Sequence, residues 1–413
     1  MKNRNIFILF LLSFIARIIY SLYVHQPKDL IQSDMEIYFR ISSLIQRGIW
    51  DENHFFQPVG FPLILLKLRD YFENWSLALS ILQATASTLT LYFIWKTTSF
   101  TWGEKNAKFI LIVGALHIPW ILFTGLSLPE TFYTFFLSIL LWSGCQILYQ
   151  HKTLLNSIIW GITFSIAFWI KGQHIFLLPL LIFSLWLKDK NRFLNKTIIP
   201  VCLIFISSLS LHGHLTYKTI GKAQFSPTAG GLNFVEGKCP SKRNSDTKNM
   251  TFYSPLYYHL RMDTYKKWNH PFSDSTYFMQ EGLKCIKENP MVLVQSLENI
   301  PYLFFGNPIW PLDWNKHANS IRLYELLFTL ICLPGIFIYF FTMFKNFNSN
   351  EFILWILPML SIFLTVYIFK SEARYRVPFD VFFIPVAIRG IDLLMNHFQF
   401  RPIKRAHLQL IKS

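Results

Sequence analysis

Asp34 is the first side chain in the sequence whose setting suggests chemistry. It follows an apolar run that ends near Val24, in the segment Ser33-Asp34-Met35-Glu36, whose Ser-x-x-Glu spacing is typical of a capping box at a helix start. Amide groups at a helix start favour an ionised carboxylate. At a membrane surface this carboxylate could accept a proton from an incoming hydroxyl or amine; the alternative is that Asp34 only caps the helix.

Glu130 is a second carboxylate in an unusual place. It follows Pro129 at the start of an apolar run, with Thr131 and Tyr133 as its nearby polar company. An ionisable group at that depth is costly, which indicates either a functional site or a buried cation partner. Arg17, in the middle of the first apolar run, could be that partner in a purely structural ion pair.

A basic turn covers residues 370–378, Lys-Ser-Glu-Ala-Arg-Tyr-Arg-Val-Pro. The forked guanidinium groups of Arg374 and Arg376 can bind phosphate oxygens bidentately. Basic residues at a membrane edge usually only extend toward the lipid headgroups, but this turn falls on the side that the positive-inside rule disfavours, which favours a function. Lys171 and His174 are weaker candidates to bind the same anion.

The composition indicates an all-α membrane protein. Of 413 residues, 52% are hydrophobic and only 15% are charged, which is too apolar for an ordinary soluble domain. The net charge of +16 lies between apolar runs and at the ends, so it reports topology and anionic lipid, and no nucleic-acid partner is expected.

Ten apolar runs come close to the length of about 20 residues that a membrane-spanning helix needs. They cover approximately residues 6–24, 76–95, 107–124, 129–149, 154–170, 174–187, 197–215, 321–344, 351–369 and 377–396. The first run has no small-residue cleavage site, so we interpret it as a retained span instead of a signal peptide. The sequence therefore predicts a polytopic helical bundle of about ten spans.

Basic residues on alternate loops place both termini in the cytoplasm. The predicted organisation is a transmembrane core at 1–215, a non-cytoplasmic insert at 216–320, further spans at 321–396 and a basic cytoplasmic tail at 397–413. Within the core, the non-cytoplasmic loop 25–75 should form two interfacial helices, one amphipathic along 37–45 and one beginning near Pro62.

The insert should be mainly helical. Turn formers occupy residues 226–231, and a helical stretch from Asp274 to Glu288 breaks at Asn289-Pro290 and resumes toward Phe305. Cys239 and Cys285 both lie in this insert. A disulfide between them and two free thiols are equally compatible with the sequence.

Taken in order along the chain, these residues resemble motifs of one family. They are Asp34 with Tyr38; Gln57-Pro58-Val59-Gly60-Phe61-Pro62-Leu63; Pro129-Glu130; Thr228-Ala229-Gly230-Gly231-Leu232-Asn233-Phe234; Glu288-Asn289-Pro290; and Glu372-Ala373-Arg374-Tyr375-Arg376-Val377-Pro378. Almost from end to end, the chain resembles the GT-C superfamily of polyprenyl-phosphate-dependent glycosyltransferases. The likeness is to the bacterial branch related to protein O-mannosyltransferases and the lipid A aminoarabinose transferase.

The resemblance implies a role for each matching residue. Asp34 would be the catalytic carboxylate, Glu130 a second carboxylate in the acceptor or metal region, and Arg374 and Arg376, aided by Lys171, would bind the donor phosphate. The substrate site would also include the following side chains: Tyr38, His174, Glu372 and Tyr375.

The resemblance leaves open whether a divalent metal takes part, and it implies no set of metal ligands. The family often has an adjacent Asp-Glu pair, whereas Met35 follows Asp34 here. Some members of the family that the chain resembles work without a metal. Glu36 lies two residues after Asp34, and residues two apart on a helix point to nearly opposite faces. These two carboxylates are therefore not expected to share one ion.

The predicted function is an inverting transfer of a hexosyl or pentosyl group from a polyprenyl-phosphate donor. The acceptor would be a lipid, glycan or protein at the non-cytoplasmic face of a bacterial inner (plasma) membrane, with membrane lipids around the chain. One alternative is a transporter or flippase of lipid-linked glycans, which should have charges deep along a path. Another is an O-antigen ligase or polymerase with a pyrophosphate-linked donor.

Overall fold

The computed structural model describes residues 2–49, 52–150, 153–188, 197–239, 274–306 and 318–399. These residues form helices and no strand, which confirms the all-α prediction. The predicted basic tail, 397–413, lies almost wholly outside the described residues, as does the middle of the insert.

Six helical segments of the described chain are long and apolar enough to cross a membrane. They are α1 (Lys2–Ile19) with its continuation Tyr20–Val24, α4 (Trp75–Trp102), α7 (Glu130–Gln150), α10 (Ile199–Ile220), α16 (Ala318–Lys345), and α17 (Ser349–Glu351) running through Phe352–Ile356 into α18 (Leu357–Ile368). The chain is thus an integral membrane protein, but the count of about ten spans is not confirmed.

The remaining predicted spans are helical but shorter, bent or interrupted by charge. α8 (Thr153–Ile170) and α9 (Leu177–Lys188) are short apolar helices, and α19 (Asp380–Gln399) carries an Arg389–Asp392 ion pair of 2.9 Å. The run predicted at 107–124 breaks into α5 (Glu104–Ala115) and α6 (Ile118–Leu122), which meet at a bend of 55°. Pro119, in the first turn of α6, lacks the amide that would continue α5.

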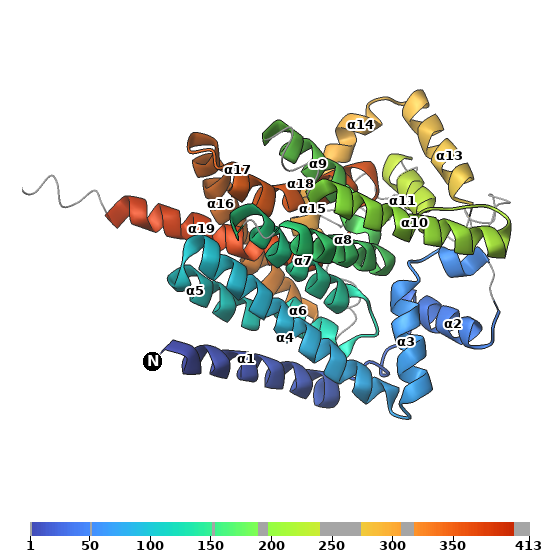
Figure 1. Ribbon diagram of the computed structural model, residues 1–413, viewed down its shortest axis with the longest axis horizontal. Helices are drawn as coiled ribbons and strands as arrows, with labels where there is room; N and C mark the ends of the chain where they lie inside the picture. The colour runs from blue at the N-terminus through green and yellow to red at the C-terminus, as the bar shows by residue number, and fades with distance from the viewer. Residues whose placement is uncertain are drawn as a thin grey trace, which may run out of the picture.

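Both predicted helical regions outside the spans lie at one end of the bundle (Figure 1). The first loop forms α2 (Asp34–Gln46) and α3 (Gly60–Tyr71), and the insert contributes α11 (Ala229–Lys238) and α13 (Ser275–Glu288). The start of α1 and the end of α19 lie at the opposite end (Figure 1). Segments separated by some 200 residues in the sequence therefore share one end of the molecule.

Two local predictions about helix starts need correction. α2 does begin at Asp34, but Ser33 has φ 54° and ψ −124° and makes no side-chain capping bond, so the predicted capping box is absent. Ala229 opens α11, so the predicted turn at 226–231 ends three residues earlier than expected. In both places tertiary contacts determine the backbone more strongly than the local turn chemistry does.

The later part of the insert agrees with the prediction. Asp274 caps α13 by accepting a hydrogen bond of 3.0 Å from the Tyr277 amide. After the break at Asn289-Pro290, the helical turns α14 (Val292–Gln295) and Ser296–Glu298 lead into α15 (Asn299–Phe305). Cys239 and Cys285 form a disulfide with a Cα–Cα distance of 5.3 Å, which joins the end of α11 to α13.

Candidate functional site

A cavity of about 860 Å³ opens between the first loop, the insert and the ends of several long helices. This volume lies in the range of small-molecule sites. Its charged lining residues, among those the structure describes, are Asp34, Glu130, Lys171, Glu236, Lys370 and Arg374. Sequence segments from both halves of the chain therefore bring their charges to one space.

The cavity brings Asp34 and Arg374 into direct contact. Arg374 donates from Nη2 to Oδ2 of Asp34 at 2.7 Å, across 340 residues of sequence. Asp34 is the first residue of α2, and Arg374 lies in the turn between α18 and α19. Their side chains are 21% and 10% exposed, so the pair is partly shielded from bulk water yet reachable from the cavity.

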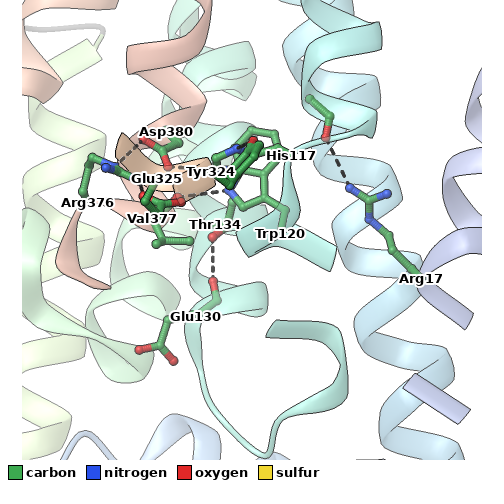
Figure 2. A network of polar contacts seen from close by, with 11 residues as sticks. Arg17, His117, Trp120, Glu130, Thr134, Tyr324, Glu325, Arg376, Val377 and Asp380 are labelled. Atoms are coloured by element: carbon green, nitrogen blue, oxygen red, sulfur yellow. Dashed lines mark hydrogen bonds and ion pairs between the residues drawn. The ribbon is translucent and has the colours of Figure 1, made fainter. Parts of the chain in front are cut away.

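Glu130, the first residue of α7, is paired with a different cation from the one that the sequence suggested. Lys171, in the short link after α8, donates to Glu130 Oε1 at 2.7 Å, and Arg374 Nε lies 3.9 Å from the same oxygen. Arg17 is not its partner: its guanidinium bonds Ser87 Oγ at 2.7 Å and stays within α1, α4 and α5 (Figure 2). The suggested Arg17–Glu130 pair is therefore wrong.

A chain of ion pairs continues from Arg374 toward the insert. Arg374 Nε lies 3.0 Å from Glu372, and Lys370 Nζ lies 3.0 Å from Glu372 and 2.9 Å from Glu236 of α11. Burial alone would raise the pKa of Glu372, but Lys370 and Arg374 lower it to about 2. For Glu236, burial outweighs the attraction of Lys370 and raises the pKa of its carboxyl.

Lys171 is largely buried and lies on the other side of Arg374 from this chain of ion pairs. Burial lowers the pKa of its amine, while Glu130 opposes that effect. Its ammonium lies 5.4 Å from the centre of the Tyr375 ring, within the range of a cation–π contact. Lys171, Glu130 and Tyr375 thus form one wall of the cavity.

Tyr38 lines the cavity, whereas His174 does not. Tyr38 packs edge-on against Phe61 with ring centroids 5.3 Å apart. His174 is fully buried behind the wall, and its ring nitrogens lie 2.9 Å from Tyr133 Oη and 3.1 Å from the Phe164 carbonyl oxygen. With both ring nitrogens engaged, His174 has none left for a substrate, so its position does not support the predicted role in substrate binding.

Arg376 is also outside the cavity lining. It is 1% exposed, contacts Glu325 closely and lies 3.2 Å from Asp380 (Figure 2). His117 Nε2 lies 3.0 Å from the other Asp380 oxygen, and Trp120 donates to the Val377 carbonyl at 3.0 Å. Two carboxylates already neutralise this guanidinium, so the expectation that Arg376 joins Arg374 at a phosphate is not supported by its position.

The chain is similar to an oligosaccharyltransferase from Archaeoglobus fulgidus tethered to an acceptor peptide, with a TM-score of 0.51 and 11% identity over 96% of this chain and 50% of that one. The chain thus spans about half the length of that enzyme. The likeness is one of fold, because the two chains share the same helical arrangement.

A second similar structure is ArnT from Cupriavidus metallidurans bound to undecaprenyl phosphate. Its TM-score is 0.42, with 12% identity over 94% of this chain and 78% of that one. No protein-family model matches the sequence, and no curated protein matches it. The likeness to the archaeal oligosaccharyltransferase is therefore visible in the helix arrangement and not in overall sequence identity.

The carboxylates at the cavity do not fit a metal ion. Asp34 is held by Arg374 and Glu130 by Lys171, so each carboxylate already has a cation beside it. Across the described ranges, no three or more His, Cys, Asp or Glu side chains are grouped to hold a metal. Glu36 is exposed on α2 and does not line the cavity.

Asn233 and Glu236 are polar cavity residues to which the sequence analysis assigned no role. They lie three residues apart on α11, and both line the cavity. The available signal was their i, i+3 spacing among apolar residues, which is typical of a polar stripe on a packed helix. Asn233 was noted only as part of the motif 228–234, and the preceding residues 226–231 were predicted to form a turn.

Proposed function

We propose that the chain is a membrane glycosyltransferase that moves a sugar from a polyprenyl-phosphate donor to a lipid, glycan or protein acceptor. The observation that carries this proposal is the Asp34–Arg374 contact of 2.7 Å in the wall of a large cavity. A proton acceptor and a phosphate-binding group then border the same space. The likeness of fold to the archaeal oligosaccharyltransferase supports a transferase of this general kind.

Asp34 acts as the general base. Arg374 holds Oδ2, and Oδ1 makes no hydrogen bond to a described residue, so Oδ1 can face an acceptor hydroxyl or amine. As the acceptor atom attacks the sugar C1, its proton passes to Asp34, and the bond from C1 to the phosphate oxygen breaks. The single displacement inverts the configuration at C1, and the polyprenyl phosphate leaves with the bonding electrons.

Lys171, Lys370 and Arg374 stabilise the leaving phosphate. In the connected group these three cations face four carboxylates, Asp34, Glu130, Glu236 and Glu372. Already paired cations bind a singly charged phosphodiester weakly, but their attraction grows as a second negative charge develops on the leaving phosphate. Stabilisation that grows toward the transition state accelerates the reaction.

Glu130 belongs to the acceptor side of the site. Its Oε1 contacts Lys171, while the buried Oε2 has no hydrogen-bond partner among the described residues. Buried acceptors of this kind are normally satisfied, so a substrate donor is the natural partner for Oε2. Glu130 would orient the acceptor near Asp34 without taking its proton.

The proposed location of the site is the non-cytoplasmic face, with both termini in the cytoplasm. Basic residues on alternate loops support this orientation. A transporter is supported less well, because the deep charged side chains Arg376, Glu325 and Asp380 pair with one another and do not line the cavity. A lipid-linked donor suits a face where nucleotide-sugars are not supplied.

The test compares Asp34→Asn with Glu36→Gln in purified protein reconstituted in lipid. Asp34→Asn removes the base but keeps the shape, so transfer from a polyprenyl-phosphate sugar should fall by about 10²- to 10⁴-fold. Glu36 is exposed on the same helix, so Glu36→Gln should transfer at the wild-type rate. Transfer that survives Asp34→Asn in folded protein would make Asp34 a structural residue and overturn the mechanism.

A further inference from the structure

α11 presents two polar side chains to the cavity from the insert. Asn233 and Glu236 lie one helical turn apart and both line the cavity. Glu236 is only 7% exposed, although it belongs to a polar insert. The Asn233 side chain makes no hydrogen bond to a described residue, so its amide is available to a ligand.

Contacts of α11 place both residues beside Lys370, one of the cations proposed to bind the phosphate. The Lys370 amide donates to the Asn233 carbonyl at 3.1 Å, and Lys370 Nζ lies 2.9 Å from Glu236 Oε2. Gly237 approaches the next segment so closely that a Cβ there would lie 2.6 Å from the Phe369 carbonyl carbon. A sugar attached to a phosphate bound at Lys370 would therefore lie next to α11.

The chemistry of the two side chains suits sugar hydroxyls. Lys370 orients Glu236 through Oε2, and Oε1 remains able to accept hydrogen bonds, which are strong when the acceptor is charged. The Asn233 amide can both donate and accept. A carboxylate and an amide at i, i+3 spacing can thus bind neighbouring hydroxyls of one ring.

We infer that Asn233 and Glu236 form the subsite that binds the sugar of the donor and selects a sugar with free hydroxyls and no carboxylate of its own. The second part follows from charge, because the connected wall already holds four carboxylates against three cations. A uronic acid would add another negative charge beside Glu236. This inference rests on the proposed function.

The experiment measures binding to the full chain in lipid nanodiscs. The probes are bare polyprenyl phosphate and the same lipid carrying glucose, mannose, galactose or glucuronic acid. Wild-type protein should bind at least one neutral hexose lipid more tightly than the bare lipid, and glucuronic acid more weakly than glucose. Asn233→Ala should reduce the sugar-dependent gain by roughly 10-fold and leave the bare lipid affinity unchanged. Glu236→Gln should reduce the gain by a similar factor, measured against the bare lipid affinity of the same variant, because Glu236 also pairs with Lys370 beside the phosphate.

Glu298→Gln is the matched control, because Glu298 is an exposed carboxylate of the same insert outside the cavity. If both cavity variants keep the wild-type gain while the protein still transfers sugar, the subsite assignment is wrong and the proposed function stands. If glucuronic acid binds as tightly as glucose, the charge selection is wrong. A wild-type protein that binds none of these lipids contradicts the proposed function itself, and the subsite with it.

Discussion

Arg374 and Arg376 show how differently two residues of one short motif can be used. Arg374 is shared by Asp34 and Glu372 at the cavity, whereas Arg376 is locked between Glu325 and Asp380 in the interior. The sequence identified both as cations of one turn, since nothing local distinguishes them. Their partners lie up to 340 residues away, and only the fold reveals which guanidinium reaches a ligand.

The two arginines should therefore respond differently to the same substitution. Arg376→Gln leaves the buried Asp380 and the largely buried Glu325 without their cation, which should cost about 3–5 kcal/mol of stability and lower the midpoint of thermal unfolding. Arg374→Gln should weaken donor binding by roughly 10-fold with a smaller loss of stability, because its partner Asp34 lines the cavity. Arg40→Gln, an exposed site on α2, is the control for both measurements. Equal losses of stability in the two variants would contradict this division of roles.

At the scale of the element, hydrophobic runs predicted where helices occur better than where they begin. The run that contains α7 was found because apolar residues fill it, and Glu130 at its start was recognised as costly. The prediction of a capping box at Ser33 was wrong because this residue has a positive φ, which the sequence pattern did not indicate. α11 was missed because its two glycines suggested a turn, whereas Gly231 packs closely against Ser275 of α13.

The position of α11 depends on one further glycine. Gly237→Ala would drive a Cβ into the Phe369 backbone, so the helix must shift away from the Lys370 segment. We expect a loss of about 1–3 kcal/mol in stability and a weaker preference for sugar-linked over bare polyprenyl phosphate. Gly230→Ala in the same helix is the stability control, because no atom lies within 4 Å of a Cβ there, and replacing a helical glycine by alanine is neutral or slightly stabilising. The same unfolding midpoint in both variants would show that the contact with Phe369 does not position α11.

At the scale of the whole molecule, the first loop and the insert meet at one end of the bundle, and the start of α1 and the end of α19 lie at the other (Figure 1). The sequence predicted this separation from charge bias and loop length. It could not show that Asp34 would meet Arg374, or that Cys239 would pair with Cys285, because both depend on distances that the packing of distant helices determines. The predicted count of about ten spans is not confirmed, since hydropathy alone does not distinguish a crossing helix from a short or broken one.

The arrangement predicts the orientation of the chain in its membrane. Lys28 is exposed in the first loop near α2, and Lys105 is exposed at the turn between α4 and α5, at the opposite end. In intact cells, a thiol reagent that cannot cross the membrane should label Lys28→Cys but reach Lys105→Cys only after permeabilisation. Both substitutions are made in a Cys202→Ser background, which is itself the control: Cys202 is a partly exposed free thiol, whereas Cys239 and Cys285 are bonded and Cys145 and Cys332 are buried. The reverse pattern would place the cavity on the cytoplasmic side, where the argument for a lipid-linked donor loses its basis because soluble nucleotide-sugars are available there.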